Sequence, residues 1–580
     1  MKKFLALALA LAMMFTLVAC STSGDNSGNT VTPSAGSAAT PGTGDSGNTD
    51  SGNTESGGAY NLTVNLSSEP ATIDPALNSA VDGAVMLNHF FEGLIKLGPV
   101  ENGEEMRGAE FVPGQAEKWD VVDNADGTQV WTFHLRDGIQ WSDGQPVTAE
   151  DFVYSWQRLV DPATAADYAY MIDVVVNAND IMAGAIAPSE LGVRAIDDKT
   201  FEVTLITNVP YFTDIAGFPA CFPVRKDIIE SAGDQWTFDP ATYIGNGPYK
   251  LQSWTHSEQI VAVKNDKHYD YANLGPDSIT FKLIDDQNAM LNGFQTGELD
   301  YIEDLPIAEI PALLDSGELK IVPYLGTYYV EFNTTLAPFD NPQIREAFNL
   351  VIDRTFIVTN ITQTAQVPAS GFVPAGIYDA NQSGDFRAVG GDYYSVDDAD
   401  YEANCEKARQ ILADAGYPGG AGFPTVEYLY NTSDAHKAIG ESLQNVWQKE
   451  LGVTVQLQNE EWNTFLETRK QGRFSICRGG WIADYNDAVN FLDMFVTGGG
   501  NNDPQYANPD FDALIRQIKA ESNPTTRTKL LHEAEDMLLG RDWVVAPIYF
   551  YTNKYMLKPG ISGFFHSPMG YTIFSYSKQQ

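Results

Sequence analysis

Cysteine is scarce in this chain, which has 580 residues and only four Cys. Four cysteines are too few for a disulfide scaffold, and no Cys-x-x-Cys pair is present to bind zinc. A chain of this length can bury large cores and needs neither disulfides nor a metal to hold its fold. At most one disulfide can form among Cys221, Cys405 and Cys477, and we expect each of them to act as a small buried hydrophobic group.

Basic residues are also few, since 35 Lys and Arg face 77 Asp and Glu and the formal net charge is −42. Nucleic-acid binding requires surplus Lys and Arg to neutralise phosphates, so the composition argues against a nucleic-acid partner. The same shortage excludes a polybasic contact with anionic lipids. The length predicts roughly three or four domains' worth of chain. The composition therefore indicates a large, acidic, soluble protein, and it indicates no reaction.

The first twenty residues are typical of a secretory signal. A short basic start precedes an apolar run from Phe4 to Val18, which is shorter than the ~20 residues that span a membrane. The run ends Leu17-Val-Ala-Cys20, which resembles the bacterial lipoprotein signal-peptidase motif. We expect a signal peptide at residues 1–19 and acylation of Cys20, which would supply a stable membrane anchor. The alternative is an ordinary signal peptide with an incidental cysteine.

A polar segment follows the predicted signal peptide. Ser, Thr, Gly and Asn fill 28 of the 39 positions from 21 to 59, and no apolar periodicity is present. Such a segment cannot bury apolar surface, so we expect residues 20–59 to form a disordered tether. As a flexible coil it would span roughly 35 Å on average and hold a globule away from a membrane. No later apolar stretch reaches transmembrane length.

From Tyr60 onwards the sequence mixes strands and helices without a fixed repeat. Alternating apolar and polar residues predict strands at 62–66, 130–135, 201–205, 260–263 and 279–283. Thr148 is expected to cap a helix reaching about residue 159, with Asp151 completing a capping box. After residue 420, strands at 426–430 and 453–457 alternate with helices at 435–451 and 461–471. This alternation predicts an α/β domain with partly parallel strand pairing.

Catalytic motifs are absent from the sequence. His532-Glu533 lacks the second His of a zinc helix, and Asp123-Asn-Ala-Asp126-Gly127 lacks the spacing of a calcium loop. Neither Gly-x-Ser-x-Gly nor a Gly-rich phosphate loop occurs. Because catalytic groups can assemble from distant residues, missing motifs alone do not exclude an enzyme. We expect a protein that is not an enzyme and that uses no metal or cofactor.

A cluster of positive charge interrupts this acidic chain. Four cations lie within ten residues: Arg469, Lys470, Arg473 and Arg478. Asp484 follows, next to aromatic residues and shortly after the pair Gly479-Gly480, which permits close approach of a backbone. A ligand with a positive and a negative end would be served by such separated charges. The alternative interpretation is a surface basic patch beside an ordinary loop acid.

Several long motifs resemble those of the oligopeptide-binding proteins of ABC importers. They are SDGQPVTAEDFVYSWQR at 142–158, YNTSD at 430–434, EWNTFLETR at 461–469 and GWIADYN at 480–486. The similarity runs from Asn61 to about Lys558. The predicted lipid anchor on Cys20 agrees with it, since such receptors are often tethered to the membrane that carries their permease.

The resemblance implies an α/β, periplasmic-binding-protein-like fold (type II, cluster C), with two lobes that close on ligand and an additional small domain. Lobe I would comprise residues 60–81, 212–325 and 547–580. The additional domain would comprise residues 82–211, and lobe II residues 326–546. Two chain crossings between the lobes would make the hinge.

The resemblance also implies how a peptide is bound. An Asp that matches Asp484 pairs with the α-ammonium of the peptide. Cations that match Arg469, Arg478 and His436 meet the α-carboxylate at different peptide lengths. Five matching aromatic residues wall the cleft or its side-chain pockets, with plain core packing as the alternative for each: Tyr154, Tyr324, Tyr329, Trp462 and Trp481.

In this family the peptide backbone adds as a strand between the lobes, near Glu69 on one side and Gly480, Trp481 and Ile482 on the other. Main-chain hydrogen bonds are common to all peptides, so they provide affinity without demanding a particular sequence. Some relatives have a disulfide between the positions that match Gly326 and Ile482. Both cysteines are absent here, which affects local rigidity and leaves the charged contacts in place.

These features together predict a monomeric, lipid-anchored receptor on the outer face of the bacterial cytoplasmic membrane, on its extracellular or periplasmic side. It would capture short oligopeptides between closing lobes and deliver them to the permease subunits of an ABC transporter. One alternative is a binding protein for another solute, such as a nickel chelate, haem or an oligosaccharide. Another is a surface signalling or adhesion lipoprotein, and an enzyme such as a peptidase ranks last.

Overall fold

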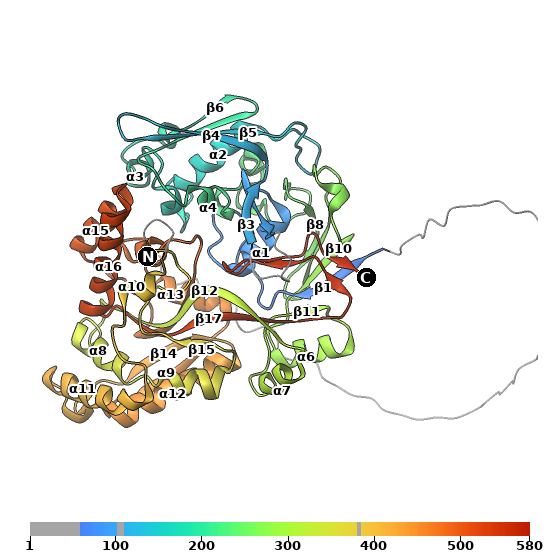
Figure 1. Ribbon diagram of the computed structural model, residues 1–580. Helices are drawn as coiled ribbons and strands as arrows, with labels where there is room; N and C mark the ends of the chain where they lie inside the picture. Colours follow the sequence, from blue (N-terminus) through green and yellow to red (C-terminus); the bar gives the residue numbers. More distant parts are fainter. Residues whose placement is uncertain (1–58, 101–108, 380–383) are drawn as a thin grey trace, which may run out of the picture. The chain divides into compact units, whose positions relative to one another are not determined.

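The computed structural model describes residues 59–100, 109–379 and 384–580 (Figure 1). The predicted signal peptide at residues 1–19, the predicted acylated Cys20 and all of the predicted tether except its last residue lie outside these ranges. Within the ranges, no helix combines the length and the apolar character needed to cross a membrane.

A mixed sheet of eleven strands is the central element of the described chain. Its two longest strands, β12 and β17, pair antiparallel and run side by side in Figure 1. The strand order is β15-β14-β16-β12-β17-β11-β1-β10-β9-β8, and β13 pairs with β17. The strands are β1 Asn61–Asn65, β8 Tyr249–Thr255, β9 Gln259–Lys264, β10 Ser278–Lys282, β11 Tyr301–Ile302, β12 Lys320–Phe332, β13 Val367–Pro368, β14 Val426–Asn431, β15 Val455–Glu460, β16 Ile476–Ile482 and β17 Val545–Leu557.

The register of β12 against β17 shifts along their length. One shift lies between Pro323 and Thr327, and a second lies between Tyr328 and Tyr329. Extra residues of this kind bend a strand and increase its twist. The lobe boundaries expected at 325/326 and 546/547 both fall within these two strands. Both expected crossings are therefore made by neighbouring, hydrogen-bonded strands.

A separate antiparallel sheet has the strand order β4-β5-β7-β6. The sheet packs on helix α2, where the Trp156 and Phe201 rings meet edge to face at 5.3 Å. The capping box predicted for this helix is confirmed, since the Thr148 side chain and Asp151 cap each other's backbone N–H groups. The elements are β4 Ala116–Asp123, β5 Gln129–Leu135, β6 Val193–Asp197, β7 Thr200–Leu205 and α2 Ala149–Val160.

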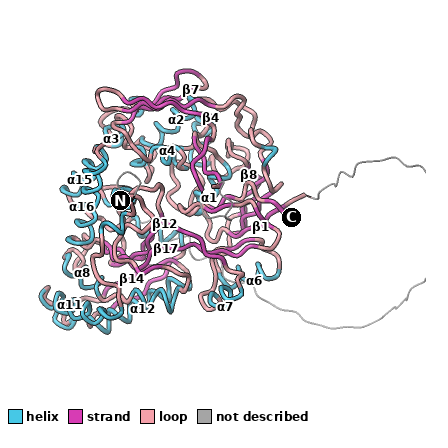
Figure 2. The backbone as a smooth tube through the Cα atoms, viewed as in Figure 1, coloured by secondary structure: helices cyan, strands magenta, loops and turns pink. Residues whose placement is uncertain are grey.

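The alternation of strands and helices predicted after residue 420 is confirmed. β14 pairs parallel with both β15 and β16, while β16 pairs antiparallel with β12. Helix α12 ends earlier than expected and continues as a π-helical turn, Trp447–Leu451, before Gly452 adopts a positive φ of 69°. Figure 2 shows α8 Pro342–Leu350, α11 Tyr401–Asp414 and α12 Asp434–Val446 at the periphery, outside strand β14. Helix α13 spans Trp462–Lys470.

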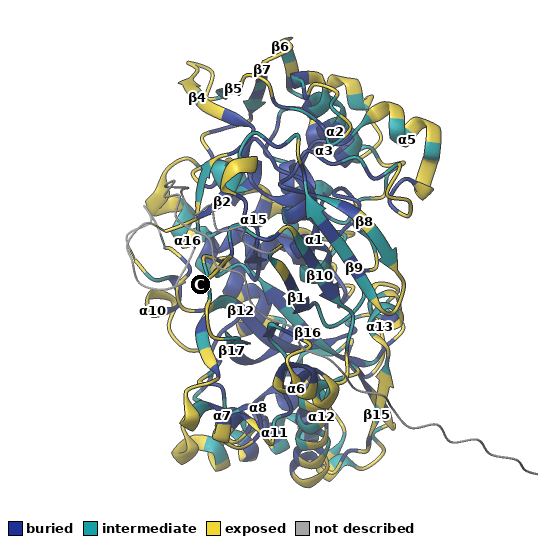
Figure 3. Cartoon of the chain, turned by 90° about the vertical axis from the view of Figure 1, so that its right-hand side faces the viewer, coloured by how far each residue is buried: buried dark blue, intermediate teal, exposed yellow. Residues whose placement is uncertain are grey.

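Most of the remaining elements are short or lie at the periphery, while α1 is a longer and largely buried helix. Figure 3 shows that exposed residues concentrate on the outer helices and turns. The helices are α1 Val81–Phe90, α3 Ala178–Met182, α4 Phe212–Ala216, α5 Lys226–Ala232, α6 Gln287–Thr296, α7 Ile310–Ser316, α9 Arg354–Phe356, α10 Phe386–Gly390, α14 Val489–Leu492, α15 Pro509–Ala520 and α16 Pro524–Glu535. The strands are β2 Ile95–Pro99, β3 Ala109–Pro113, β18 Ile561–Ser562, β19 Phe565–His566, β20 Thr572–Ile573 and β21 Lys578–Gln579.

The described cysteines are buried, as the sequence predicted, and none of them forms a disulfide, which the sequence had left open: Cys221, Cys405 and Cys477. Gly326 and Ile482, the two positions that the resemblance associates with a disulfide, lie directly opposite each other in the β12–β16 ladder. A Cβ atom at Gly326 would lie 2.4 Å from Cδ1 of Ile482. The isoleucine side chain therefore fills the space beside the glycine that a disulfide would otherwise occupy.

One buried ion pair joins α2 to the segment after β1. The Arg158 guanidinium donates to both carboxylate oxygens of Asp74, at 2.8 and 2.6 Å, and the indole N–H of Trp236 also donates to Asp74 at 3.1 Å. The side chains of Asp74 and Arg158 are 3% and 14% exposed. Arg158 lies in one of the motifs that carry the family resemblance. Its ion pair with Asp74 stabilises the fold.

Replacing Arg158 with Ala leaves the Asp74 carboxylate buried without its cation. We expect the free energy of unfolding to fall by about 3–5 kcal/mol, measured by urea denaturation with tryptophan fluorescence. Arg194→Ala is the control, because the Arg194 side chain is 68% exposed and pairs with Glu202 at the surface. The control should lose at most about 1 kcal/mol. Equal losses in the two variants would contradict a stabilising role for the buried pair.

Candidate functional site

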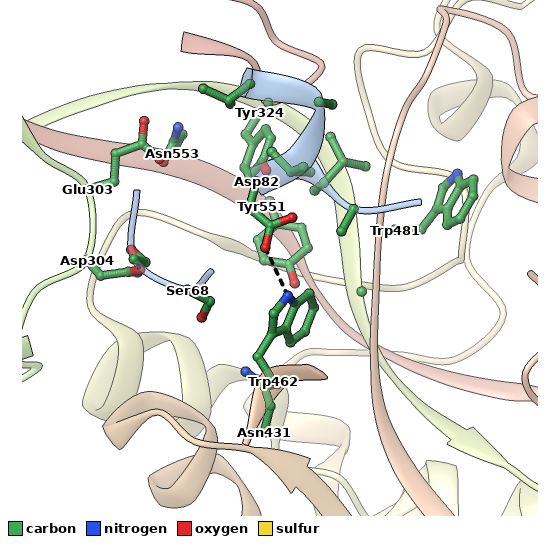
Figure 4. A pocket seen from close by; sticks show the side chains of 18 of the residues that line it. Ser68, Asp82, Glu303, Asp304, Tyr324, Asn431, Trp462, Trp481, Tyr551 and Asn553 are labelled. Carbon is green, nitrogen blue, oxygen red and sulfur yellow. Dashed lines mark hydrogen bonds between the residues drawn. The ribbon is translucent and has the colours of Figure 1, made fainter. Parts of the chain in front are cut away.

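A cavity of about 630 Å³ lies where β12, β16 and β17 meet α1, α12, α13 and the segments after β1 and β11 (Figure 4). Its volume falls within the range of roughly 300–1,000 Å³ that is usual for ligand sites. The structure brings most of the predicted binding residues into its lining: Asp484, Arg478, Arg469, His436, Gly480, Trp481, Ile482, Trp462, Tyr324 and Tyr329.

Two predicted residues do not line this cavity. The Glu69 carboxylate turns away and accepts hydrogen bonds from the Trp254 indole at 2.8 Å and from the backbone N–H of Ser257 at 2.9 Å. Its neighbours Ser67 and Ser68 do line the cavity. Tyr154 lies on α2, and its ring is 5.7 Å from the Lys226 ammonium. No residue of α2 lines the cavity.

Asp484 is buried in the cavity wall, two residues after the end of β16, and is 6% exposed. The Tyr168 hydroxyl donates to its Oδ1 at 3.1 Å, and the Asn490 amide donates to its Oδ2 at 2.9 Å. Within the described ranges, no Lys, Arg or His forms an ion pair with it. Burial raises the pKa of Asp484 to about 7, with a further contribution from the charge of Asp493. The ionised carboxylate is therefore costly until a cation arrives.

Arg478 presents a positive charge to the same cavity. It lies on β16, where Arg478, Gly480 and Ile482 share one face by strand alternation. Its guanidinium lies 5.3 Å from the centre of the Tyr328 ring, and its Nη2 donates to the Tyr551 hydroxyl at 3.4 Å. Among the residues that the structure describes, no carboxylate forms an ion pair with it.

Glycine at position 480 makes room for this arginine. A Cβ atom there would lie 2.6 Å from the Tyr551 hydroxyl and 3.1 Å from Nη2 of Arg478. A side chain would therefore displace the guanidinium from the strand face.

The other two predicted contacts for a ligand carboxylate differ from Arg478. Arg469 already forms an ion pair with Asp503, with 2.8 Å between Nε and Oδ2. The His436 ring nitrogen Nδ1 lies 3.2 Å from the Tyr328 hydroxyl. Burial, with the nearby charges of Arg478 and Lys554, holds the pKa of His436 well below its usual value. His436 is therefore neutral near pH 7 and offers a hydrogen bond in place of a charge.

Aromatic side chains connect distant parts of the chain around the cavity. The Trp462 indole N–H donates to Oδ2 of Asp82 at 3.0 Å, the bond drawn as a dashed line in Figure 4. Burial raises the pKa of Asp82 to about 6. The Tyr168 and Trp481 ring centres lie 6.3 Å apart beside Asp484. The predicted walls Trp462 and Trp481 thus make specific contacts in addition to packing.

Sequence reasoning missed several residues of this site: Tyr168, Asn490, Asp82, Glu303, Asp304 and Lys554. Tyr168 lies 316 positions before Asp484, and Asp82 lies 380 positions before Trp462. No motif carries information on such pairs. Across the described part of the chain, no group of three or more His, Cys, Asp or Glu is arranged to hold a metal ion.

Comparison with known proteins gives a consistent result. Residues 110–503 match the family model described as bacterial extracellular solute-binding proteins, family 5 Middle. The chain is 38% identical over 508 residues to the periplasmic oligopeptide-binding protein OppA of Salmonella typhimurium, covering 87% of this chain and 89% of the relative.

Two solved structures add conformational information. Haemophilus influenzae OppA in complex with the peptide RPPGFSPFR superposes with a TM-score of 0.82 at 32% identity, covering 90% of this chain and 99% of that chain. An unliganded open form of the murein tripeptide-binding protein MppA gives 0.60 at 32% identity, covering 90% of this chain and 97% of that chain.

The family model spans more than half of the chain, and the relatives are similar over nearly their whole length. The fold is accordingly a periplasmic-binding-protein-like α/β fold, and members of this family are substrate-binding proteins of transporters, not enzymes. The chain belongs to the bacterial extracellular solute-binding proteins of family 5.

Proposed function

We propose that this protein captures short oligopeptides in extended form and delivers them to the permease of an ABC importer. The single observation that carries the proposal is the electrostatic arrangement of the cavity. Within the described ranges, Asp484 is buried there without an ion-pairing cation, and Arg478 lies in the same lining without an ion-pairing carboxylate. A zwitterionic peptide supplies one charge of each sign, so both buried groups gain a partner when it binds. A neutral sugar supplies neither charge.

The free edge of β16 supports a peptide ligand. β12 pairs with β16 along its whole length, from Ile476 to Ile482. On the other edge, β14 pairs only with Ile476 and Cys477. The backbone from Arg478 to Ile482 therefore has no strand partner on that edge within the described ranges, and Gly480, Trp481 and Ile482 line the cavity. An added peptide strand would satisfy these N–H and C=O groups whatever its sequence.

Lobe closure is part of the proposal. Asp82 and Tyr168 belong to the segment expected to form the additional domain, and they contact Trp462 and Asp484 of the expected second lobe. A ligand held behind such contacts must enter while they are open. The greater similarity to a peptide complex than to an unliganded open form supports this view. The hinge would lie in β12 and β17, near the register shift that begins at Pro323.

The remaining parts of the proposal concern organisation and location. The lobes would comprise residues 60–81, 212–325 and 547–580 for lobe I and residues 326–546 for lobe II, with the additional domain at 82–211. Acylated Cys20 and the tether would hold a monomer on the outer face of the cytoplasmic membrane. The lipoprotein-like run ending in Cys20 supports the anchor, and the names of the relatives support the partnership with a transporter.

Asp484→Ala should weaken binding of trialanine by about 2–5 kcal/mol, because the peptide ammonium then lies in the cavity without its counter-ion. Isothermal titration calorimetry measures the change. N-acetyl-trialanine should bind the wild-type protein with a comparable loss and should be insensitive to the substitution. Asp510→Ala, at an exposed position of α15, is the control and should bind trialanine normally. Equal affinity for the free and acetylated peptides would refute the role of Asp484.

Peptide affinity should depend on pH through Asp484, whose pKa is about 7 in the unliganded protein. Binding of an ammonium requires the ionised carboxylate, so below pH 7 the peptide must first displace a proton. The dissociation constant should rise towards tenfold per pH unit, which corresponds to about 1.4 kcal/mol. Calorimetry in buffers of different ionisation enthalpy should show release of nearly one proton at pH 6. Asp484→Asn should abolish this acid limb; a limb that persists in the variant would assign it to another group.

Closure of the lobes predicts a more compact particle with ligand. Small-angle X-ray scattering should give a smaller radius of gyration with saturating trialanine than without it. The Asp484→Ala variant at the same peptide concentration is the control, since it should remain largely unliganded. Identical wild-type profiles with and without peptide would contradict closure.

A further inference from the structure

The cavity contains more acid than a zwitterionic peptide backbone can use. Its acidic lining residues are Asp82, Asp167, Glu303, Asp304, Glu467, Asp484 and Asp503, and its basic ones are Arg469, Lys470, Arg478 and Lys554. Two ion pairs neutralise part of this set, Asp167 with Lys470 at 2.6 Å and Asp503 with Arg469 at 2.8 Å. If Asp484 receives the peptide ammonium and Arg478 the carboxylate, an excess of negative charge remains.

Two of the remaining acids are adjacent and face the cavity together. Glu303 and Asp304 follow β11 directly, and Figure 4 shows them on the same side of the pocket, near Ser68 and Asn553. β11 pairs with β1 and β17, so the backbone that carries both acids is anchored in the central sheet. Their positions are therefore held by rigid structure.

Each carboxylate has one oxygen engaged by the protein. Oε1 of Glu303 accepts hydrogen bonds from the Tyr301 hydroxyl and, at 2.8 Å, from the Thr572 hydroxyl. Oδ2 of Asp304 accepts one from the Ser67 hydroxyl at 2.7 Å. In the described structure the other oxygen of each group accepts no hydrogen bond from protein. The side chains are thus oriented while one acceptor on each remains for a ligand.

Lys554 is the cation whose charge acts on this acidic pair. Burial raises the pKa of Glu303, the charge of Asp304 raises it further, and Lys554 partly opposes the rise. Lys554 forms no ion pair shorter than 4 Å with any described residue. One ammonium more than 4 Å away cannot neutralise two carboxylates, so a second cation near the pair would be stabilised.

Glu303 and Asp304 line the same cavity as Arg478. Tyr324 lies in the cavity wall, and the charges of Glu303, Asp304 and Arg478 all act on its hydroxyl. The lining also contains a buried hydroxyl without a hydrogen-bond partner. Thr364 is 1% exposed, and its hydroxyl makes no hydrogen bond within the described residues. A polar ligand that reaches past the backbone-binding strand would satisfy these groups.

We propose that Glu303 and Asp304 form a side-chain subsite that selects peptides carrying a lysine or an arginine. The inference rests on the proposed peptide function of the cavity and adds the substrate class. A bound ammonium or guanidinium would receive charge-assisted hydrogen bonds from the two unengaged carboxylate oxygens. An acidic side chain would meet like charges in the same place, so the subsite discriminates by attraction and by repulsion.

The test compares lysine with norleucine, which has a similar apolar stem and no charge. Calorimetry measures wild-type binding of Lys-Ala-Ala, Ala-Lys-Ala and Ala-Ala-Lys, of their norleucine and glutamate counterparts, and of trialanine. We expect at least one lysine peptide to bind about tenfold more tightly than its norleucine counterpart, and the matching glutamate peptide to bind more weakly than either. The ratio of the two affinities cancels any general change in binding.

The same ratio is then measured in the double variant Glu303→Gln, Asp304→Asn and in the control Glu467→Gln, which removes an exposed acid of the same lining. We expect the double variant to bring the lysine-to-norleucine ratio close to one and the control to keep it. Thermal unfolding of both variants establishes that they are folded. The subsite would be overturned if norleucine peptides bound the wild-type protein as tightly as lysine peptides at all three positions. An unchanged lysine-to-norleucine affinity ratio in the double variant would overturn it as well. Failure of trialanine to bind would instead refute the proposed function.

Discussion

The burial of the Asp484 carboxylate without a cation is the constraint on which the site depends. Transfer of an isolated charge from water into a protein interior is costly, and the rise of the Asp484 pKa to about 7 reflects that cost. Tyr168 and Asn490 orient the carboxylate by hydrogen bonds, but neither supplies a positive charge. The folded protein therefore holds an unsatisfied electrostatic demand that a ligand ammonium can meet.

The strand that leads to Asp484 would supply the second half of the recognition that we propose. β16 is supported along one edge by β12 and, within the described ranges, is unpaired over much of the other, so its backbone is both rigid and available. Glycine at 480 lets the Arg478 side chain lie along the strand face, where no described carboxylate forms an ion pair with it. Backbone groups and end charges are common to all peptides, and they account for affinity without sequence preference. Any preference must come from other parts of the lining, and Glu303 and Asp304 are two adjacent acids whose charge the peptide termini would leave unmatched.

The same arrangement connects recognition with conformational change. The contacts that enclose the cavity, Trp462 with Asp82 and Tyr168 with Asp484, join residues more than 300 positions apart in the chain. Each involves an acid whose pKa is raised by burial. In the closure that we propose, forming the cavity and desolvating its carboxylates would be one event, and a cationic group of the ligand would lower its free-energy cost.

Local patterns determined a large part of this protein. Alternation and capping residues placed β5, β7 and α2 within one or two residues of their observed bounds, because these signals act over one or two turns of chain. Motif resemblance brought Asp484, Arg478 and Trp462 to the site. It also assigned Tyr154 to the cleft wall, whereas no residue of α2 lines the cavity, because a local motif does not show how far its helix lies from the ligand. Only the tertiary structure decided that Arg469 is neutralised by Asp503, that His436 is uncharged, and that Glu303, Asp304 and Tyr168 join the lining. Charge state and counter-ions depend on burial and on partners from distant segments, and neither quantity is written in the residues next to the group in question.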